Sequence, residues 1–188
     1  MILKSIFSAA VLRAKEKMRN RKTPIASFYA NLKAFDGYYE KKWFPYTMPI
    51  SDIYGLRAAF NLIAGDETLY ERHARIGSAT RAAVKEAGLK LHLQSGYSNT
   101  VTVFDIPECT DAKSILDEMR TKYNIMLAGS FDELSGKVIR IGHMGENARL
   151  EHMVPTLEAL SATLTDLGVK LQGNLADLFL QHYREFQP

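Results

Sequence analysis

Arg140 is the residue of this chain whose position most clearly indicates chemistry. It lies within the apolar run Val138-Ile139-Arg140-Ile141, and glycines stand on both sides of that run. An unpaired cation among apolar side chains costs far more free energy than its neighbours return, so we expect an acidic group to meet Arg140. That group is either a carboxylate of the protein or the carboxylate of a ligand. A guanidinium is planar, permanently charged and able to pair bidentately with a carboxylate, so Arg140 is a candidate for carboxylate recognition.

The sequence around Arg140 resembles a known family signature. Residues 136–145, GKVIRIGHMG, are similar to the C-terminal signature of class V pyridoxal-phosphate aminotransferases of the alanine–glyoxylate and serine–pyruvate type. Other segments follow in the family's order, namely RKTP at 21–24, FPYTMP at 44–49, SNTVT at 98–102 and IMLAG at 125–129. The similarity runs from about residue 14 to about residue 171. Several ordered motifs over this length are more specific than any one of them.

The resemblance implies roles for two residues. Arg140 would bind the α-carboxylate of the amino-acid or oxo-acid substrate. Thr47 would contact the phosphate of pyridoxal 5'-phosphate across a dimer interface. Some relatives have a phosphate-binding tyrosine three residues before this threonine, where this chain has Phe44, and Tyr46 is a candidate to replace it. A purely structural role for Thr47, in a turn before the Met-Pro pair that follows, stays open. The sequence assigns no catalytic residue and no metal ligand.

The resemblance also indicates what the chain lacks. A full-length relative carries a large domain ahead of the matched region, with the lysine that binds the cofactor covalently. Residues 1–13 are atypical for the family, and Lys4 lacks the sequence context of that lysine. We therefore expect the C-terminal part of a transaminase, inactive alone and with only marginal affinity for the cofactor. The complete enzyme would pass an amino group between a small amino acid (alanine or serine) and an oxo-acid (glyoxylate or pyruvate).

Two further interpretations of the chain remain open. It is either a non-catalytic module that associates with a separate large-domain chain or a full-length relative, or a truncated gene product without a selected function. A homodimer is the other expected association, because apolar helix faces left exposed favour self-association.

Composition limits the other classes of function. The chain has a net charge of only +3, and its basic residues are scattered along the sequence. Both features argue against a surface that binds nucleic acid. No apolar run reaches the roughly twenty residues that cross a bilayer. The single cysteine, Cys109, excludes an intramolecular disulfide and fits a reducing cytoplasm. The five histidines show no metal-ligand spacing.

Apolar periodicity and breaking residues predict the elements that position Arg140 and Thr47. Helices are expected over residues 9–20, 27–40, 50–64 and 66–88, the last capped by Asp66. Strands are expected over 100–106, 125–128 and 138–141. A helix from Thr110 or Asp111 to Tyr123 follows the first strand, and Asn147 is expected to cap a long helix that ends at Gly168.

The order of these elements predicts an α+β fold. From residue 96 onward it gives a small, mostly antiparallel sheet covered by helices on one face. This matches the small C-terminal domain of fold-type-I aminotransferases that the resemblance implies. The expected organisation is an atypical N-terminus (1–13), a helical interdomain and dimer-interface segment (14–95), the small domain (96–171) and a C-terminal tail helix (172–188).

Overall fold

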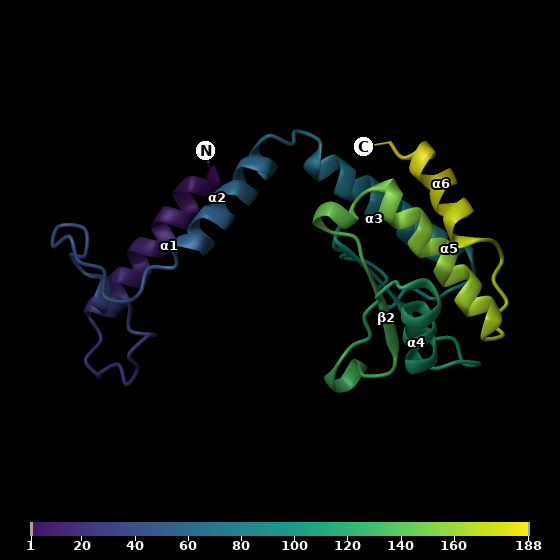
Figure 1. Cartoon of the computed structure of the whole chain (residues 1–188), viewed down its shortest axis with the longest axis horizontal. Coiled ribbons are helices and arrows are strands. Elements are labelled where there is room, and N and C mark those ends of the chain that lie inside the picture. Colours follow the sequence, from purple (N-terminus) through teal and green to yellow (C-terminus); the bar gives the residue numbers. More distant parts are fainter. Residues whose placement is uncertain (1, 188) are drawn as a thin grey trace. The chain divides into compact units, whose positions relative to one another are not determined.

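The computed structural model describes residues 2–187, and their side chains from residue 11 onward. The chain forms two compact units that divide between Asn61 and Leu62, and each is described by itself. The first unit contains α1 (Ile2–Arg19), the short 3-10 helix η1 (Leu32–Phe35) and most of α2 (Ile50–Ala64), as labelled in Figure 1. The predicted helices near residues 9–20 and over 50–64 are confirmed.

The helix predicted over residues 27–40 is wrong, because only η1 is helical there. The Asn31 side chain accepts a hydrogen bond from the Lys33 amide at 3.1 Å, which starts a single tight turn. Gly37 then takes a φ of +70°, a left-handed conformation that leaves the helical path. Aromatic rings hold these turns together in edge-on and tilted contacts, among them those of Phe28, Tyr29, Phe35, Phe44 and Tyr46. The aromatic residues therefore form a cluster of turns instead of one helix face.

The apolar residues of α2 are exposed. Ile53, Leu56, Phe60 and Ile63 recur three, four and three residues apart, and each is between 49% and 71% exposed. Among the described residues, none of the α2 side chains is buried. A helix of this composition with no covered face is a candidate contact surface.

The second unit has an antiparallel sheet and four α-helices. The strands β1 (Val101–Asp105) and β2 (Val138–Gly142) pair so that Val103 faces Arg140. Single bridges extend the sheet on both sides, from Leu91 to Phe104 and from Ala128 to Arg140. The strand predicted over 125–128 is therefore reduced to one bridge. The helices are α3 (Leu69–Glu86), α4 (Ala112–Tyr123), α5 (Leu150–Asp166) and α6 (Leu175–Glu185).

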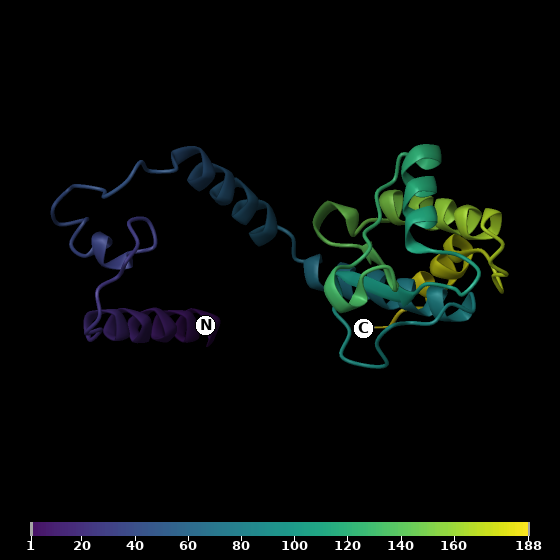
Figure 2. The same ribbon diagram turned by 90° about the horizontal axis from the view of Figure 1, so that it is seen from below.

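The helices cover one face of this sheet. Phe104, Ile139 and Ile141 point to that face and are fully buried against residues of α3, α4 and α5, such as Ile76, Ile115 and Leu157. The helix α6 packs against both α3 and α5, as Figure 2 shows from below. Arg140 lies on the opposite, less buried face. The predicted α+β fold, with helices on one side of a small antiparallel sheet, is thus confirmed.

The predicted helix caps had different outcomes. Asp111 is the N-cap of α4, where its carboxylate accepts a hydrogen bond from the Ser114 amide at 2.9 Å, as expected. The prediction for Asn147 is wrong, because this residue ends the 3-10 helix η3 (Gly145–Asn147) and α5 begins at Leu150. Asp66 stands two residues before the N-cap position of α3 and binds Thr68 and Arg72.

None of the helices in the described part of the chain is both long and apolar enough to cross a membrane.

Candidate functional site

Arg140 is held at its backbone by the neighbouring segment of the sheet. Its amide donates to the Ala128 carbonyl at 2.7 Å, and its carbonyl accepts from the Ala128 amide at 3.3 Å. Both backbone groups of an antiparallel residue point to the same neighbour, so Arg140 and Val103 form a pair without hydrogen bonds across β1 and β2. The alternation of a strand then sends Ile139 and Ile141 into the core and the arginine to the other face.

The guanidinium of Arg140 has two further neighbours. Its Nε donates a hydrogen bond to the Gly129 carbonyl at 2.6 Å. Its Cζ lies 5.6 Å from the centroid of the Phe131 ring. Neither contact neutralises the positive charge, because a carbonyl and an aromatic ring carry no net charge.

No acid pairs with Arg140 in the described part of the chain, where no carboxylate oxygen lies within 4.0 Å of its guanidinium. Its terminal nitrogens Nη1 and Nη2 make no hydrogen bond to a described residue. Of the two alternatives that the sequence left open, a carboxylate of the protein is not found beside Arg140 among the described side chains of residues 11–187. A half-buried guanidinium with both terminal nitrogens free is suited to an anionic ligand.

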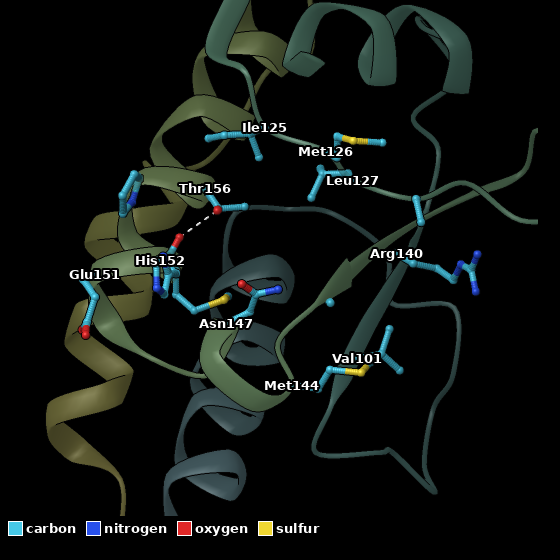
Figure 3. Close-up of a pocket in the computed structure, with 14 residues that line it drawn as sticks. Val101, Ile125, Met126, Leu127, Arg140, Met144, Asn147, Glu151, His152 and Thr156 are labelled. Carbon is cyan, nitrogen blue, oxygen red and sulfur yellow. Dashed lines mark hydrogen bonds between the residues drawn. The ribbon is translucent and has the colours of Figure 1, made fainter. Parts of the chain in front are cut away.

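An open pocket of about 610 Å³ lies next to β2, between residues 125–128 and the first turns of α5. Figure 3 shows that the Arg140 side chain points away from His152 and Thr156, which line the other side of this pocket. The hydroxyl of Thr156 donates a hydrogen bond to the His152 carbonyl at 2.7 Å. Arg140 itself lines this pocket on the β2 side, and its guanidinium extends away from α5.

Two histidines hold the segment that follows the arginine strand. The His143 ring is fully buried, its Nδ1 lies 3.2 Å from the Asn99 carbonyl, and its Nε2 lies 2.8 Å from the Thr102 hydroxyl. Burial lowers the pKa of His143 to about 4, so the ring is neutral at pH 7. The Nδ1 nitrogen therefore donates to the carbonyl, and Nε2 accepts from the hydroxyl.

His73 of α3 fixes the next turn. Its Nε2 accepts a hydrogen bond from the Gly145 amide at 3.1 Å, while its Nδ1 lies 2.7 Å from the Leu69 carbonyl. Gly145 has a φ of +59°, a conformation that glycine adopts without strain. His73 thus has a structural contact, and it ties α3 to the end of the arginine strand.

Thr47 belongs to the first unit, in the loop between η1 and α2, and its side chain is exposed. The hydroxyl of its neighbour Tyr46 donates a hydrogen bond to the Phe28 carbonyl. Tyr46 is therefore engaged within the aromatic cluster, and its replacement of the tyrosine at position 44 stays a prediction. The role of Thr47 toward the cofactor phosphate stays a prediction.

Sequence reasoning missed the surroundings of the arginine. The Gly129 carbonyl and the Phe131 ring contact Arg140 from positions eleven and nine residues earlier. Gly129 ends the IMLAG motif, which gives no sign of this contact, and Phe131 lies outside the motifs. The alternation of His143 with Ile139 and Ile141 along the strand indicates the core face, and the His143 ring is buried. Within the described residues, no group of three or more His, Cys, Asp or Glu side chains is arranged to hold a metal ion.

Comparison with known proteins finds many similar chains, among them two serine–glyoxylate aminotransferases and one solved structure. The chain is 36% identical over 173 residues to a serine–glyoxylate aminotransferase of Methylorubrum extorquens, covering 87% of this chain and 42% of that protein. It is 38% identical over 149 residues to a serine–glyoxylate aminotransferase of Arabidopsis thaliana, covering 75% and 37%. The crystal structure of a ureidoglycine–glyoxylate aminotransferase from Bacillus subtilis superposes with a TM-score of 0.83 at 31% identity, covering 92% of this chain and 46% of that one. No protein-family model matches the chain.

The fold and the sequence thus agree on a pyridoxal-phosphate aminotransferase small domain and the helices that precede it. The homologues of this chain are class V aminotransferases, and it corresponds to the C-terminal part of those enzymes. The chain spans less than half the length of the relatives named above.

Proposed function

We propose that this chain forms the substrate-carboxylate subsite of a pyridoxal-phosphate-dependent aminotransferase, and that Arg140 binds the carboxylate. The observation that supports this proposal is the half-buried guanidinium with Nη1 and Nη2 free and no acid within 4.0 Å among the described residues. A bidentate pair with a carboxylate would use one N–H of each terminal nitrogen and neutralise the charge.

The proposed reaction is transfer of an amino group from a small donor, alanine or serine, to glyoxylate or pyruvate. The cofactor, when bound, supplies the electron sink for this chemistry. The task of Arg140 is to fix one end of the substrate, so that the reacting carbon is presented in one orientation. Thr47 would hold the cofactor phosphate, and its exposed hydroxyl is available for that contact.

A chimeric enzyme tests the role of Arg140. It joins residues 14–187 of this chain to the N-terminal part of the Methylorubrum extorquens enzyme, and transamination is measured with serine and glyoxylate. Arg140→Lys is expected to lower kcat/KM by about 10- to 150-fold, because hydrogen bonds to a charged group are lost. The exposed neighbour Lys137 provides the control, since Lys137→Arg should leave kcat/KM unchanged. Unaltered kcat/KM in an Arg140→Lys chimera that still binds the cofactor would contradict the proposal.

We also propose that the 188 residues do not catalyse transamination alone, because none of their lysines has the sequence context of the family's cofactor lysine. Incubation with pyridoxal 5'-phosphate, reduction by borohydride and measurement of the intact mass test this. No specific adduct is expected. A stoichiometric adduct on one lysine that substrate removes would overturn this part of the proposal.

The exposed apolar residues of α2 support association with another chain. We propose a homodimer, supported by the exposed apolar residues Ile53, Leu56 and Phe60. Leu56→Asp should shift the chain toward the monomer in sedimentation velocity, whereas Arg57→Asp on the same helix should do so much less. The alternative, a non-catalytic module bound to a separate large-domain chain, predicts co-purification with a protein that carries the cofactor lysine.

The single exposed cysteine, Cys109, supports a cytoplasmic location.

A further inference from the structure

The loop between Ala128 and β2 holds the Arg140 guanidinium from two directions. We propose that Phe131 is a positioning residue for Arg140: its ring, together with the Gly129 carbonyl, orients the guanidinium so that only Nη1 and Nη2 meet an incoming carboxylate. This inference rests on the proposed carboxylate-binding role of Arg140 and adds the residue that sets the geometry of binding.

The Gly129 carbonyl determines which nitrogens remain free. It accepts from Nε at 2.6 Å, and the Arg140 backbone bonds to Ala128 immediately before it. A carboxylate can pair with a guanidinium side-on, through Nε and one Nη, or end-on, through both Nη atoms. With Nε already donating to a carbonyl, the end-on mode is the one that remains.

The Phe131 ring lies against the cation and not in the core. Phe131 is 70% exposed, and the Arg140 Cζ is 5.6 Å from its ring centroid. This distance is within the range in which a cation is attracted to an aromatic face. Because so much of the ring is exposed, Phe131 gains little free energy from burial in the core. Its contact with the Arg140 guanidinium is therefore the main interaction of the ring.

The loop backbone sets the position of this ring. Phe131 is extended, and Asp132 follows it with a φ of +53°, an uncommon conformation for a residue with a side chain. The turn is closed by the Leu134 amide, which donates to the Phe131 carbonyl at 3.2 Å, and by the Ser135 amide, which donates to the Asp132 carbonyl at 3.1 Å. These bonds hold the ring beside Arg140 without help from the core.

An aromatic ring at position 131 leaves the positive charge of Arg140 unneutralised. Asp132 and Glu133 come directly after Phe131, yet within the described residues no carboxylate lies within 4.0 Å of the guanidinium. An acid in place of the ring would neutralise Arg140 and compete with a carboxylate ligand. A cation–π contact orients the guanidinium and leaves its charge available to the ligand.

Nuclear magnetic resonance of the full chain tests the proposal. The Arg140 Nε–Hε signal reports both exchange with water and the binding of pyruvate, with methyl pyruvate as the probe that lacks a carboxylate. Phe131→Leu should speed Nε–Hε exchange and weaken pyruvate binding by about two- to fivefold each, the effect of one exposed cation–π contact. Phe131→Tyr keeps the ring and should restore both values. Tyr70→Leu removes a ring that is 84% exposed on α3 and should change neither.

The outcomes separate this inference from the proposed function. If pyruvate binds at Arg140 and Phe131→Leu changes neither exchange nor affinity, the positioning role is overturned while the carboxylate role stands. If pyruvate shifts no Arg140 signal in any variant, the carboxylate role is overturned, and faster exchange in Phe131→Leu still establishes the contact. The backbone amide spectrum outside residues 129–137 must match the wild type, which excludes a general loss of folding.

Discussion

The hydroxyl of Thr102 donates a hydrogen bond to Nε2 of His143 across 2.8 Å, and this bond joins β1 to the segment that follows β2. The ring's other nitrogen faces the Asn99 carbonyl, and the His143 amide donates to the Thr100 carbonyl at 2.9 Å. Three contacts from one fully buried residue thus fasten the end of the arginine strand. The contact to Thr102 requires a neutral ring, because a protonated Nε2 cannot accept a hydrogen bond.

The second unit is therefore expected to lose stability in mild acid. The pKa of His143 is lowered from the ordinary value of 6.5 to about 4, chiefly by burial, with the charges of Arg81 and His73 acting in the same direction. Between these two values the unfolded chain binds the proton and the folded chain does not. The contribution of His143 is complete above pH 6.5 and is lost as the pH falls toward 4, on the order of 3 kcal/mol in total. Urea unfolding followed by the Ile139 amide at several pH values measures it.

A variant separates this effect from that of the carboxylates. His143→Asn keeps a donor near the Asn99 carbonyl and removes the titrating ring. It should be less stable at pH 7 and show a shallower decline between pH 6.5 and 4.5 than the wild type. Parallel declines in the two proteins would show that His143 is not the group responsible.

A second prediction concerns Asp105 at the end of β1. The Lys90 ammonium, at 2.7 Å, is the main cause of the lowered pKa of this carboxyl, and His92 contributes a second contact at 2.8 Å. Lys90→Met should raise the pKa of Asp105 toward its ordinary value, as measured by carboxyl carbon titration. Because Lys90 is largely exposed, the loss of stability at pH 7 should stay below about 1 kcal/mol.

The matched control for this variant is Lys113→Met. Lys113 is an exposed lysine that pairs with Asp117 at 2.6 Å on α4. Its removal should raise the pKa of Asp117 and leave that of Asp105 unchanged. If both lysine variants alter Asp105 equally, the shift comes from the overall charge of the protein and not from the local pair.

Shortening one buried side chain of α5 is expected to lower the stability of the second unit strongly. Leu157 is fully buried in the cluster that joins the sheet to the helices. Leu157→Ala should lower the free energy of unfolding of the second unit by about 2–5 kcal/mol, because it removes buried surface and leaves a cavity. Leu93→Ala, at a residue that is 47% exposed in the same unit, should cost no more than about 0.5 kcal/mol. Chemical denaturation of the two variants compares them, and equal costs would be inconsistent with the described core.

The cap of α4 predicts a smaller and more local effect. Asp111→Ala removes the acceptor for the Ser114 amide and should measurably destabilise the second unit. Asp117→Ala removes an exposed carboxylate within the same helix and should cost less stability than Asp111→Ala. Amide exchange in the first turn of α4 should increase for Asp111→Ala alone, and an equal increase in both variants would argue against capping by Asp111.

Local patterns were sufficient where a segment's own side chains decide its structure. The apolar spacing of residues 50–64 predicted α2, and the β-branched residues of 100–106 predicted β1. They failed over 27–40, where rings from distant positions, such as Phe28 and Tyr46, pack on one another and stabilise turns. Periodicity within a segment does not reveal such partners.

For the candidate site, the sequence by itself determined which residue carries the charge. An arginine among apolar strand residues requires an unusual environment, and the ordered motifs indicated the class V aminotransferase family, which the homologues and the fold confirm. The sequence did not determine the partner of Arg140. A protein acid and a ligand were both compatible with it, since the position of a carboxylate relative to a guanidinium depends on how distant segments fold.

Only the tertiary structure decided the surroundings of that charge. Strand pairing places Ala128 and Gly129 beside Arg140, and the turn after Gly129 brings the Phe131 ring against the guanidinium. These contacts depend on a backbone carbonyl and on a loop conformation. Neither can be recognised from the types of the residues alone. Backbone groups are chemically the same at every position, so only the folded chain determines which carbonyl meets which side chain.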